Sequence, residues 1–204
     1  MQFTHIEAVL SQGCKLHAFL SGGGLRVVRI EDGTGELKGY GEHPHVEDAL
    51  AHANLDSGRG HRPYSEVYGK EFPHYLTGNT NPTSPLDAWI RKGNTFDVTK
   101  DGDEYVFDLV GYQHFEVPEQ VKEDIDKGSG CIEWEDSRGF RYRSEPSRFP
   151  NGQPTISTSI ISEPPDSGSV DGFMWRIKKT GRAATFWDAL EAAWEASPME
   201  LEKD

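Results

Sequence analysis

The chain has few cysteines and no long apolar run. Its two cysteines, Cys14 and Cys131, form neither a disulfide framework nor a CxxC metal-binding pair, so we expect both to be reduced. No stretch approaches the roughly 18 apolar residues of a membrane span. The first residues also lack the basic start and apolar run of a signal peptide. We therefore expect a cytoplasmic protein that makes no membrane contact.

Positive charge is also scarce. The 204 residues include 21 Lys and Arg against 34 Asp and Glu, which gives a formal net charge of -13. This balance disfavours general binding to nucleic acid or to anionic membranes. The excess is concentrated in residues 101–136, where twelve carboxylates accompany only two lysines.

The motifs of common catalytic centres are missing as well. The chain has no GxSxG nucleophile elbow and no DxDxDG calcium loop. The run Gly22-Gly23-Gly24 fits neither the GxGxxG dinucleotide motif nor a Walker phosphate loop. We therefore predict no catalytic residue and no cofactor, and we expect binding rather than enzymatic activity.

What is present suffices for a folded core, because hydrophobic residues make up 35% of the chain and aromatic residues 11%. Thr4 and Glu7 have the spacing of a capping box, which predicts a helix from Thr4 to Gly13. Turn residues then separate three strand-like segments, and apolar residues at helical spacing follow Pro44. The expected strands are residues 15–20, 25–31 and 36–41, so the N-terminal part reads αβββα.

Two hairpins are predicted in the second half. Asp101-Gly102 is a two-residue turn signal, which would pair Val98 with Tyr105 and Phe96 with Phe107. The second hairpin, residues 131–144, has the loop Ser137-Arg138-Gly139. Its expected cross-strand pairs are Trp134 with Tyr142, Glu133 with Arg143, and Glu135 with Arg141.

Further helices and strands complete the second half. Ser84 and Thr185 are candidate N-caps of two helices, the second of them strongly amphipathic, and Pro118 opens a third that ends at Gly128. The sequence predicts an α+β fold with an N-terminal αβββα unit, central antiparallel β-hairpins, and a C-terminal strand plus amphipathic helix. We expect either two domains, residues 1–95 and 96–204, or one continuous domain.

A short pattern occurs twice in the chain. Arg29-Ile30 precedes Asp48-Ala49-Leu50, and Arg176-Ile177 precedes Asp188-Ala189-Leu190. The spacings differ, because 18 residues separate Ile30 from Asp48 and 11 separate Ile177 from Asp188. The simpler interpretation is the ordinary sequence of a strand followed by a helix, and an internal duplication stays an alternative.

Histidines gather in one segment, since five of the eight lie between His43 and His74. If a helix begins at His45, then His45, Asp48 and His52 share one of its faces, with His43 nearby. Imidazole and carboxylate groups suit Zn or Mn, so a metal-dependent hydrolase is an alternative function. The alternative for each side chain is a surface or capping role.

The acidic block supports the leading hypothesis, a non-enzymatic binding protein that engages a basic site on a protein partner as an inhibitor or antagonist. A carboxylate-rich face can imitate the phosphates of DNA, so the partner could itself be a nucleic-acid-binding protein. The expected contact residues are Asp108 of the first hairpin and Glu119, Glu123 and Asp126 of the acidic helix. Plain solubility is the competing explanation for such a charge run.

Nucleic-acid binding is a further alternative. Arg141, Arg143 and Arg148 alternate with aromatic residues, as on single-strand binding surfaces. The predicted hairpin register places glutamates opposite the first two arginines, which favours a charge-paired hairpin instead. Nucleic acid is therefore the less favoured partner.

Overall fold

The computed structural model describes residues 3–61, 82–164 and 172–201. In these ranges the protein has an α+β fold, as predicted, with antiparallel sheets. The chain divides into two compact units, Met1–Gly111 with Ile177–Met199 and Tyr112–Arg176 with Glu200–Asp204. No helix in the described ranges is long and apolar enough to cross a membrane.

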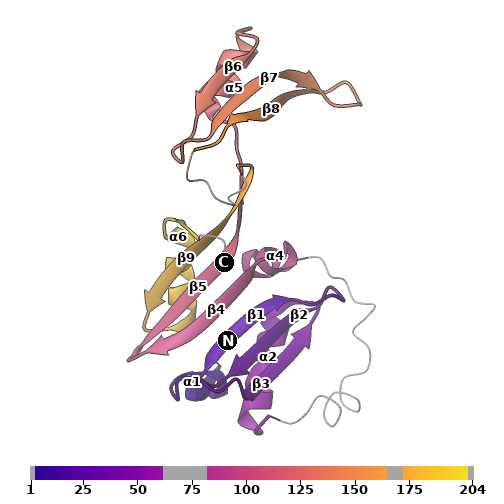
Figure 1. The fold of residues 1–204 in the computed structure, drawn as a ribbon. Coiled ribbons are helices and arrows are strands. Elements are labelled where there is room, and N and C mark those ends of the chain that lie inside the picture. The colour runs from indigo at the N-terminus through magenta and orange to yellow at the C-terminus, as the bar shows by residue number, and fades with distance from the viewer. Residues whose placement is uncertain (1–2, 62–81, 165–171, 202–204) are drawn as a thin grey trace. The chain divides into compact units, whose positions relative to one another are not determined.

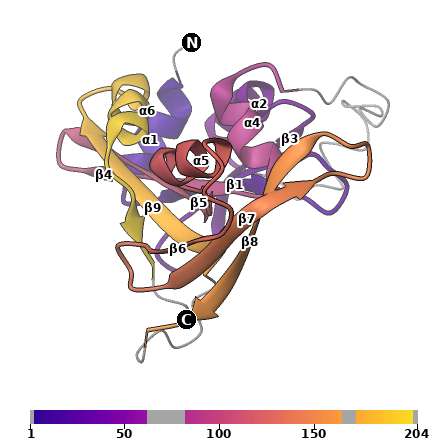
Figure 2. The ribbon, with the colours of Figure 1, turned by 90° about the horizontal axis from the view of Figure 1, so that it is seen from above.

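The first unit is a seven-stranded sheet with helices on one face (Figures 1 and 2). The strand order is β10-β9-β5-β4-β1-β2-β3. Its helices are α1 (Thr4–Leu10), α2 (Val46–Gly58), α4 (Pro85–Arg91) and α6 (Phe186–Glu195). Its strands are β1 (Lys15–Leu20), β2 (Arg26–Glu31), β3 (Leu37–His43), β4 (Thr95–Asp101), β5 (Glu104–His114), β9 (Met174–Ala183) and β10 (Met199–Glu200).

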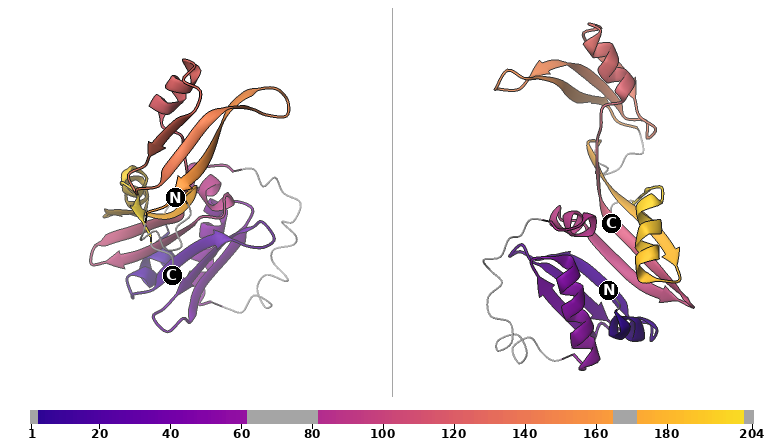
Figure 3. Two further views of the ribbon diagram at one scale, coloured as in Figure 1. Left: turned by 45° about the horizontal axis from the view of Figure 1, so that its top comes forward. Right: turned by 180° about the vertical axis from the view of Figure 1, so that it is seen from behind.

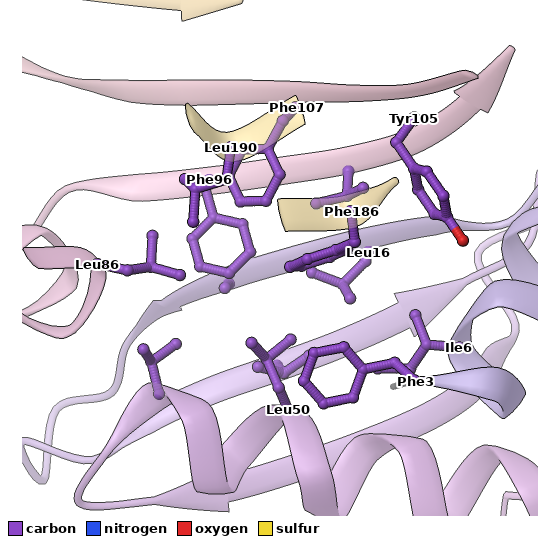
Figure 4. Close-up of a cluster of buried hydrophobic side chains, with 14 of the residues drawn as sticks. Phe3, Ile6, Leu16, Leu50, Leu86, Phe96, Tyr105, Phe107, Phe186 and Leu190 are labelled. Carbon is purple, nitrogen blue, oxygen red and sulfur yellow. The ribbon is translucent and has the colours of Figure 1, made fainter. Parts of the chain in front are cut away.

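The main hydrophobic core fills the space between this sheet and its helices (Figure 4). Alternate residues of β4 and β5 point into it, because successive side chains of a strand face opposite sides of a sheet. Phe96 and Phe107 stack there with ring centroids 4.9 Å apart. Every residue of this core cluster belongs to the first unit.

The turn of the β4–β5 hairpin lies one residue later in the chain than expected, and this changes the pairing of the two strands. Val98 pairs with Phe107 rather than with Tyr105, since Gly102-Asp103 forms the turn instead of Asp101-Gly102. Each partner therefore moves by two residues along the strand, and the side-chain faces stay as predicted.

The expected capping box is not formed. Helix α1 begins at Thr4 itself, so Thr4 is not the N-cap, and no side chain makes a cap hydrogen bond at the N-cap position. Instead, the backbone N–H groups of His5 and Ile6 donate to Oδ1 of Asn54 in α2, at 3.0 and 3.1 Å. A tertiary contact thus does what the local motif predicted for Thr4 and Glu7.

The first unit contains the same order of elements twice. One half is α1-β1-β2-β3-α2 and the other is α4-β4-β5-β9-α6, and β1 and β4 meet at the centre of the sheet. The sheet order is symmetric about this pair, with β2 and β5 next and β3 and β9 outside them. The second unit lies in the chain between β5 and β9, where the first half has only the β2–β3 turn.

The two halves share a close contact between their last strand and their last helix. A Cβ at Gly41 of β3 would lie 1.9 Å from the Ala49 carbonyl oxygen of α2. A Cβ at Gly181 of β9 would lie 2.2 Å from the Ala189 carbonyl oxygen of α6. Alanine follows glycine at the same spacing in both, 41 to 49 and 181 to 189, and helices α2 and α6 cross the sheet on its covered face (Figure 3, right).

The sequence echo therefore has a structural counterpart only in its helical part. Asp48-Ala49-Leu50 and Asp188-Ala189-Leu190 occupy matching positions of α2 and α6. Arg29-Ile30 lies on β2, however, whereas Arg176-Ile177 lies on β9, and these strands are not counterparts in the sheet. The different spacings in the echo follow from that mismatch.

The second unit is a small sheet with one helix. The helix is α5 (Glu119–Asp126), and the strands are β6 (Ile132–Glu135), β7 (Arg141–Arg148) and β8 (Pro154–Ser162), in the order β6-β7-β8. All three predicted cross-strand pairs of β6 and β7 are confirmed, and Gly139 has the expected positive φ of 85°. The β7–β8 hairpin continues well beyond the end of β6 (Figure 3, left).

Arg138 anchors this unit between aromatic rings. Its guanidinium carbon lies 3.8 Å from the centroid of the Trp175 ring, and Nη2 donates to the carboxylate of Asp136 at 2.6 Å. Nη2 and the Tyr142 hydroxyl also both donate to the Gly172 carbonyl, at 3.0 and 2.7 Å. Burial and the neighbouring Asp136 raise the pKa of Tyr142 to about 12, so its hydroxyl stays protonated as a donor.

The inserted segment is also joined where it starts and ends. The backbone N–H of Phe115, just after β5, donates to the carbonyl oxygen of Phe173, just before β9, at 2.8 Å. The two aromatic rings meet edge to face at 5.3 Å. The chain therefore enters and leaves the second unit at adjacent points.

Candidate functional site

The structure brings the candidate metal-binding residues together around the start of α2. Nδ1 of His43 lies 3.2 Å from Oδ2 of Asp48, and the rings of His43 and His52 meet at 5.4 Å. Nδ1 of His52 lies 3.3 Å from the carbonyl oxygen of Glu42, and His45 is the N-cap residue of the helix. His74 lies outside the described residues.

His45 belongs to a buried ionic network rather than to an open site. Its Nδ1 lies 3.2 Å from Oδ2 of Asp87, a carboxylate with 0% exposure. The Nε of Arg26, which is 1% exposed, donates to Oδ1 of Asp87 at 2.7 Å. The backbone N–H groups of Val46 and Thr83 donate to the same carboxylate at 3.1 and 3.2 Å. Asp87 thus links β2, α2 and α4, and hydrogen bonds occupy both of its oxygens.

Burial lowers the pKa values of two histidines in this cluster. For His43 the desolvation of the ring outweighs the attraction of Asp48, which acts in the opposite direction. For His52 desolvation again outweighs the favourable carbonyl contact and Asp48. Both rings are therefore held more strongly in the neutral form than a free histidine.

No metal-ligand set appears in the parts of the chain that the structure describes. Within them, no group of three or more His, Cys, Asp or Glu side chains is arranged to hold a metal ion. Nδ1 of His45, Nδ1 of His52 and Oδ2 of Asp48 each have a protein contact instead. The Zn or Mn alternative stays a prediction without a supporting observation.

The expected acidic contact residues do not all lie in the same unit. Asp108 lies in the first unit, on the sheet face opposite the helices, where Lys178 and Thr180 bind its carboxylate at 2.8 and 2.6 Å. Glu119, Glu123 and Asp126 lie on α5 in the second unit. Asp108 therefore has its charge balanced locally, and α5 is the acidic surface that remains.

Helix α5 turns its acidic side outward. Val121 and Ile125 are buried, whereas the side chains of Glu119 and Glu123 are 77% and 54% exposed. Lys122 of the same helix contacts Glu119 at 3.0 Å, and Lys127, the C-cap residue, contacts Glu123 at 3.2 Å. Exposed pairs of this kind contribute only about 0–1 kcal/mol, so a partner can displace the lysines at little cost.

A groove runs along α5 within the second unit. Its volume is about 1130 Å³. One wall contains Lys122, Ile125 and Asp126 of α5, and the chain before the helix adds Glu116 and Val117. The other wall is the extended part of the β7–β8 hairpin, formed by Pro146, Ser147, Arg148, Pro154, Thr155 and Ile156.

The sequence had singled out Asp126 and Arg148 among the groove residues, but it did not reveal the others. The apolar groove residues Pro146 and Ile156 face each other across β7 and β8. The signal that could have revealed them is the unequal strand length, because β7 pairs with β6 only over Arg141–Ser144 and then continues to Arg148. A hairpin that is longer than its neighbouring strand has a part that this strand does not cover.

The three candidate nucleic-acid-binding arginines do not share one face, because Arg141 and Arg143 lie on one side of β7 and Arg148 lies on the other. Nη2 of Arg141 lies 3.4 Å from Glu133, its diagonal neighbour, and Nε of Arg143 donates to Sγ of Cys131 at 2.9 Å. Only Arg148 lines the groove, and its Nη1 donates to the carbonyl oxygen of Gly152. The expected register, with a glutamate opposite each strand arginine, is confirmed, but Arg141 contacts Glu133 rather than Glu135, and Arg143 contacts Cys131.

No protein-family model matches the chain, and neither a curated protein nor a solved structure does.

Proposed function

We propose that the protein is a non-enzymatic binding protein whose second unit engages a basic site on a protein partner. The observation that carries this proposal is that the acidic helix α5 also forms one wall of a groove. The groove therefore places the negative charge of α5, which can attract a partner over a distance, beside apolar residues of the hairpin that can make close contact.

The groove has the composition of a protein-binding surface. Its apolar residues include Ile125, Pro146 and Ile156, and charged residues such as Glu116 and Asp126 lie with them. Protein interfaces commonly combine an apolar centre with a polar rim. A basic partner would contact the exposed carboxylates of α5 and place an apolar side chain against the groove.

The position of the second unit in the chain is consistent with a binding role. It is inserted between two strands of a sheet whose core is complete without it. Changes to its surface therefore leave the main core of the first unit untouched. More specifically, we propose that the protein acts as an inhibitor or antagonist and that its partner is a nucleic-acid-binding protein.

Charge reversal on α5 tests the proposal directly. The tagged protein and a variant carrying Glu119→Lys, Glu123→Lys and Asp126→Lys are used to capture partners from host lysate at low and at high salt. We expect a protein whose retention falls with salt and falls about tenfold or more with the variant, as for interfaces steered by charge. The affinity of the identified protein is then measured by calorimetry.

A matched variant controls for the change in net charge. Asp101→Lys, Asp103→Lys and Glu104→Lys make the same change at the β4–β5 turn of the first unit. This control should retain the partner. Equal loss in both variants, or equal retention, would contradict binding through α5. A salt-sensitive shift of labelled RNA or DNA that is lost on Arg148→Ala would favour the nucleic-acid alternative instead.

A further inference from the structure

Strand β8 has an open outer edge. The second unit's sheet ends at β8 in the order β6-β7-β8, so in the described residues no strand pairs with that edge. Its nine residues, Pro154–Ser162, contain no charged side chain and are rich in Thr and Ile. Long uncharged strand edges of this type readily accept another strand, because their backbone N–H and C=O groups lack partners.

The strands at the two sides of the large sheet, β3 on one side and β9 with the short β10 on the other, are protected in a way that β8 is not. Strand β3 carries Lys38 and Glu42, and β9 carries Lys178 and Arg182. The short strand β10 also covers part of β9. Charged side chains on an edge are a common protection against pairing with another chain, and β8 has none.

We propose that β8 pairs with β8 of a second copy of this chain, antiparallel and centred on Thr158. The three-stranded sheets of the two copies would then join into one continuous six-stranded sheet. Pro154 at the start of β8 and Pro164 just after its end limit the pairing to this strand.

The sequence of β8 is complementary to itself in this register. Ile156 would lie opposite Ile160 of the second copy, and Ser157 opposite Ser159 of the second copy. The exposed Ile161, 41% accessible in the single chain, would lie opposite Thr155 of the second copy. The first two pairs join identical residues, the third joins two β-branched residues, and the members of each pair lie on the same face of the sheet.

The charges on β7 are arranged more favourably in this register than in its neighbours. Ser159 pairs with Arg143 on β7, and Ser157 pairs with Glu145. With Thr158 at the centre, a row across the joined sheet runs from Arg143 through the two serines to Glu145 of the second copy. A shift of two residues in either direction would place two Arg143 or two Glu145 at the ends of a row. A shift of one residue would exchange the two faces.

Sedimentation equilibrium of the full chain tests the pairing. We expect a concentration-dependent equilibrium between monomer and dimer for the unmodified chain. The exposed serines allow a matched pair of variants, because Ser157 and Ser159 both point to the outer face. Ser157→Lys with Ser159→Lys places like charges opposite each other between the copies, and Ser157→Lys with Ser159→Glu places opposite charges there.

The two variants should behave in opposite ways. The Lys/Lys variant should raise the dimer dissociation constant about tenfold or more, and the Lys/Glu variant should restore or tighten the dimer. Far-UV circular dichroism shows whether both remain folded. A chain that stays monomeric up to its solubility limit would overturn the proposal, and so would a dimer that responds equally to both variants.

Discussion

The two halves of the large sheet have the same order of elements and differ in how they close. The first half joins β2 to β3 by a short turn, whereas the second half places residues 115–173 between β5 and β9. The helix that follows is fixed in the same way in both, by Gly41 against α2 and by Gly181 against α6. The comparison teaches that the contact between the last strand and the last helix is independent of what is inserted before it.

The halves also differ in how the last helix begins. The first-turn N–H of Val46 in α2 is bonded by Asp87 from another helix, and the N-cap residue is His45. In α6 the equivalent N-cap is Thr185, whose hydroxyl accepts from the N–H of Asp188 at 3.2 Å. One helix start therefore depends on a buried ionic network, and the other depends on a local cap.

Removing the carboxylate of Asp87 should have the largest effect on stability. Asp87→Ala leaves Arg26 buried without its counter-ion, and breaking a buried pair in this way costs about 3–5 kcal/mol. The free energy of unfolding from urea titration measures the loss. A cost no larger than that of a surface substitution would mean that the network does not hold α2 and α4 in place.

Adding a methyl group at either of the two glycines should have the next largest effect. Gly41→Ala and Gly181→Ala each place a Cβ against helix backbone, which cannot move as a flexible side chain can. We expect a loss of about 1–3 kcal/mol for each. Similar losses of stability would support the equivalence of the two halves. A loss at only one of the two sites would show that the two strand–helix contacts are not equivalent.

Loss of the local cap of α6 should cost less. Thr185→Ala removes one side-chain hydrogen bond at the helix start, for which the usual cost is about 1 kcal/mol. Thr185→Ser keeps the hydroxyl and is the control variant. Urea titration of both variants beside Asp87→Ala compares a local cap with a tertiary one.

The smallest effect should be a pH dependence of the free energy of unfolding that arises from histidines of the first half alone. At the positions that match His43 and His52, the second half has Ala183 and Ala192. The folded-state pKa values of both histidines are lowered, so the unfolded chain binds protons first as pH falls below about 6.5. Stability should therefore be constant above that pH and decline below it.

The His43→Asn and His52→Gln variants check this origin. The free energy of unfolding is measured from about pH 8 to about pH 5. Each variant should flatten the decline below the ordinary histidine pKa. An unchanged slope in both would assign the pH dependence to other groups.

The sequence predicted local structure better than long-range pairing. The β6–β7 register followed correctly from the loop that ends at Gly139, and the caps of α4 and α6 followed from Ser84 and Thr185. The capping of α1 was predicted wrongly, because Asn54, a residue far away in the chain, accepts hydrogen bonds from its first N–H groups. A local motif cannot reveal such a tertiary partner.

The central pairing of β1 with β4 was also beyond sequence reasoning. Nothing local in Leu16 or Val98 indicates that they face each other across the middle of the sheet. The same holds for the groove, since Ile125 and Ile156 become its walls only when α5 packs on the hairpin. The acidic character of α5 was predictable because it depends on composition alone.

The hydrogen bond between Phe115 and Phe173 makes the inserted unit a closed loop from the viewpoint of the large sheet. A segment whose ends lie side by side constrains the two strands that it connects no more than a turn does. The entropic cost of closing a loop also rises only slowly with the length of the loop. A hairpin can therefore exchange one such segment for another while its own strands stay paired. In this respect the second unit is an exchangeable insertion, and the sheet of the first unit is the scaffold that carries it.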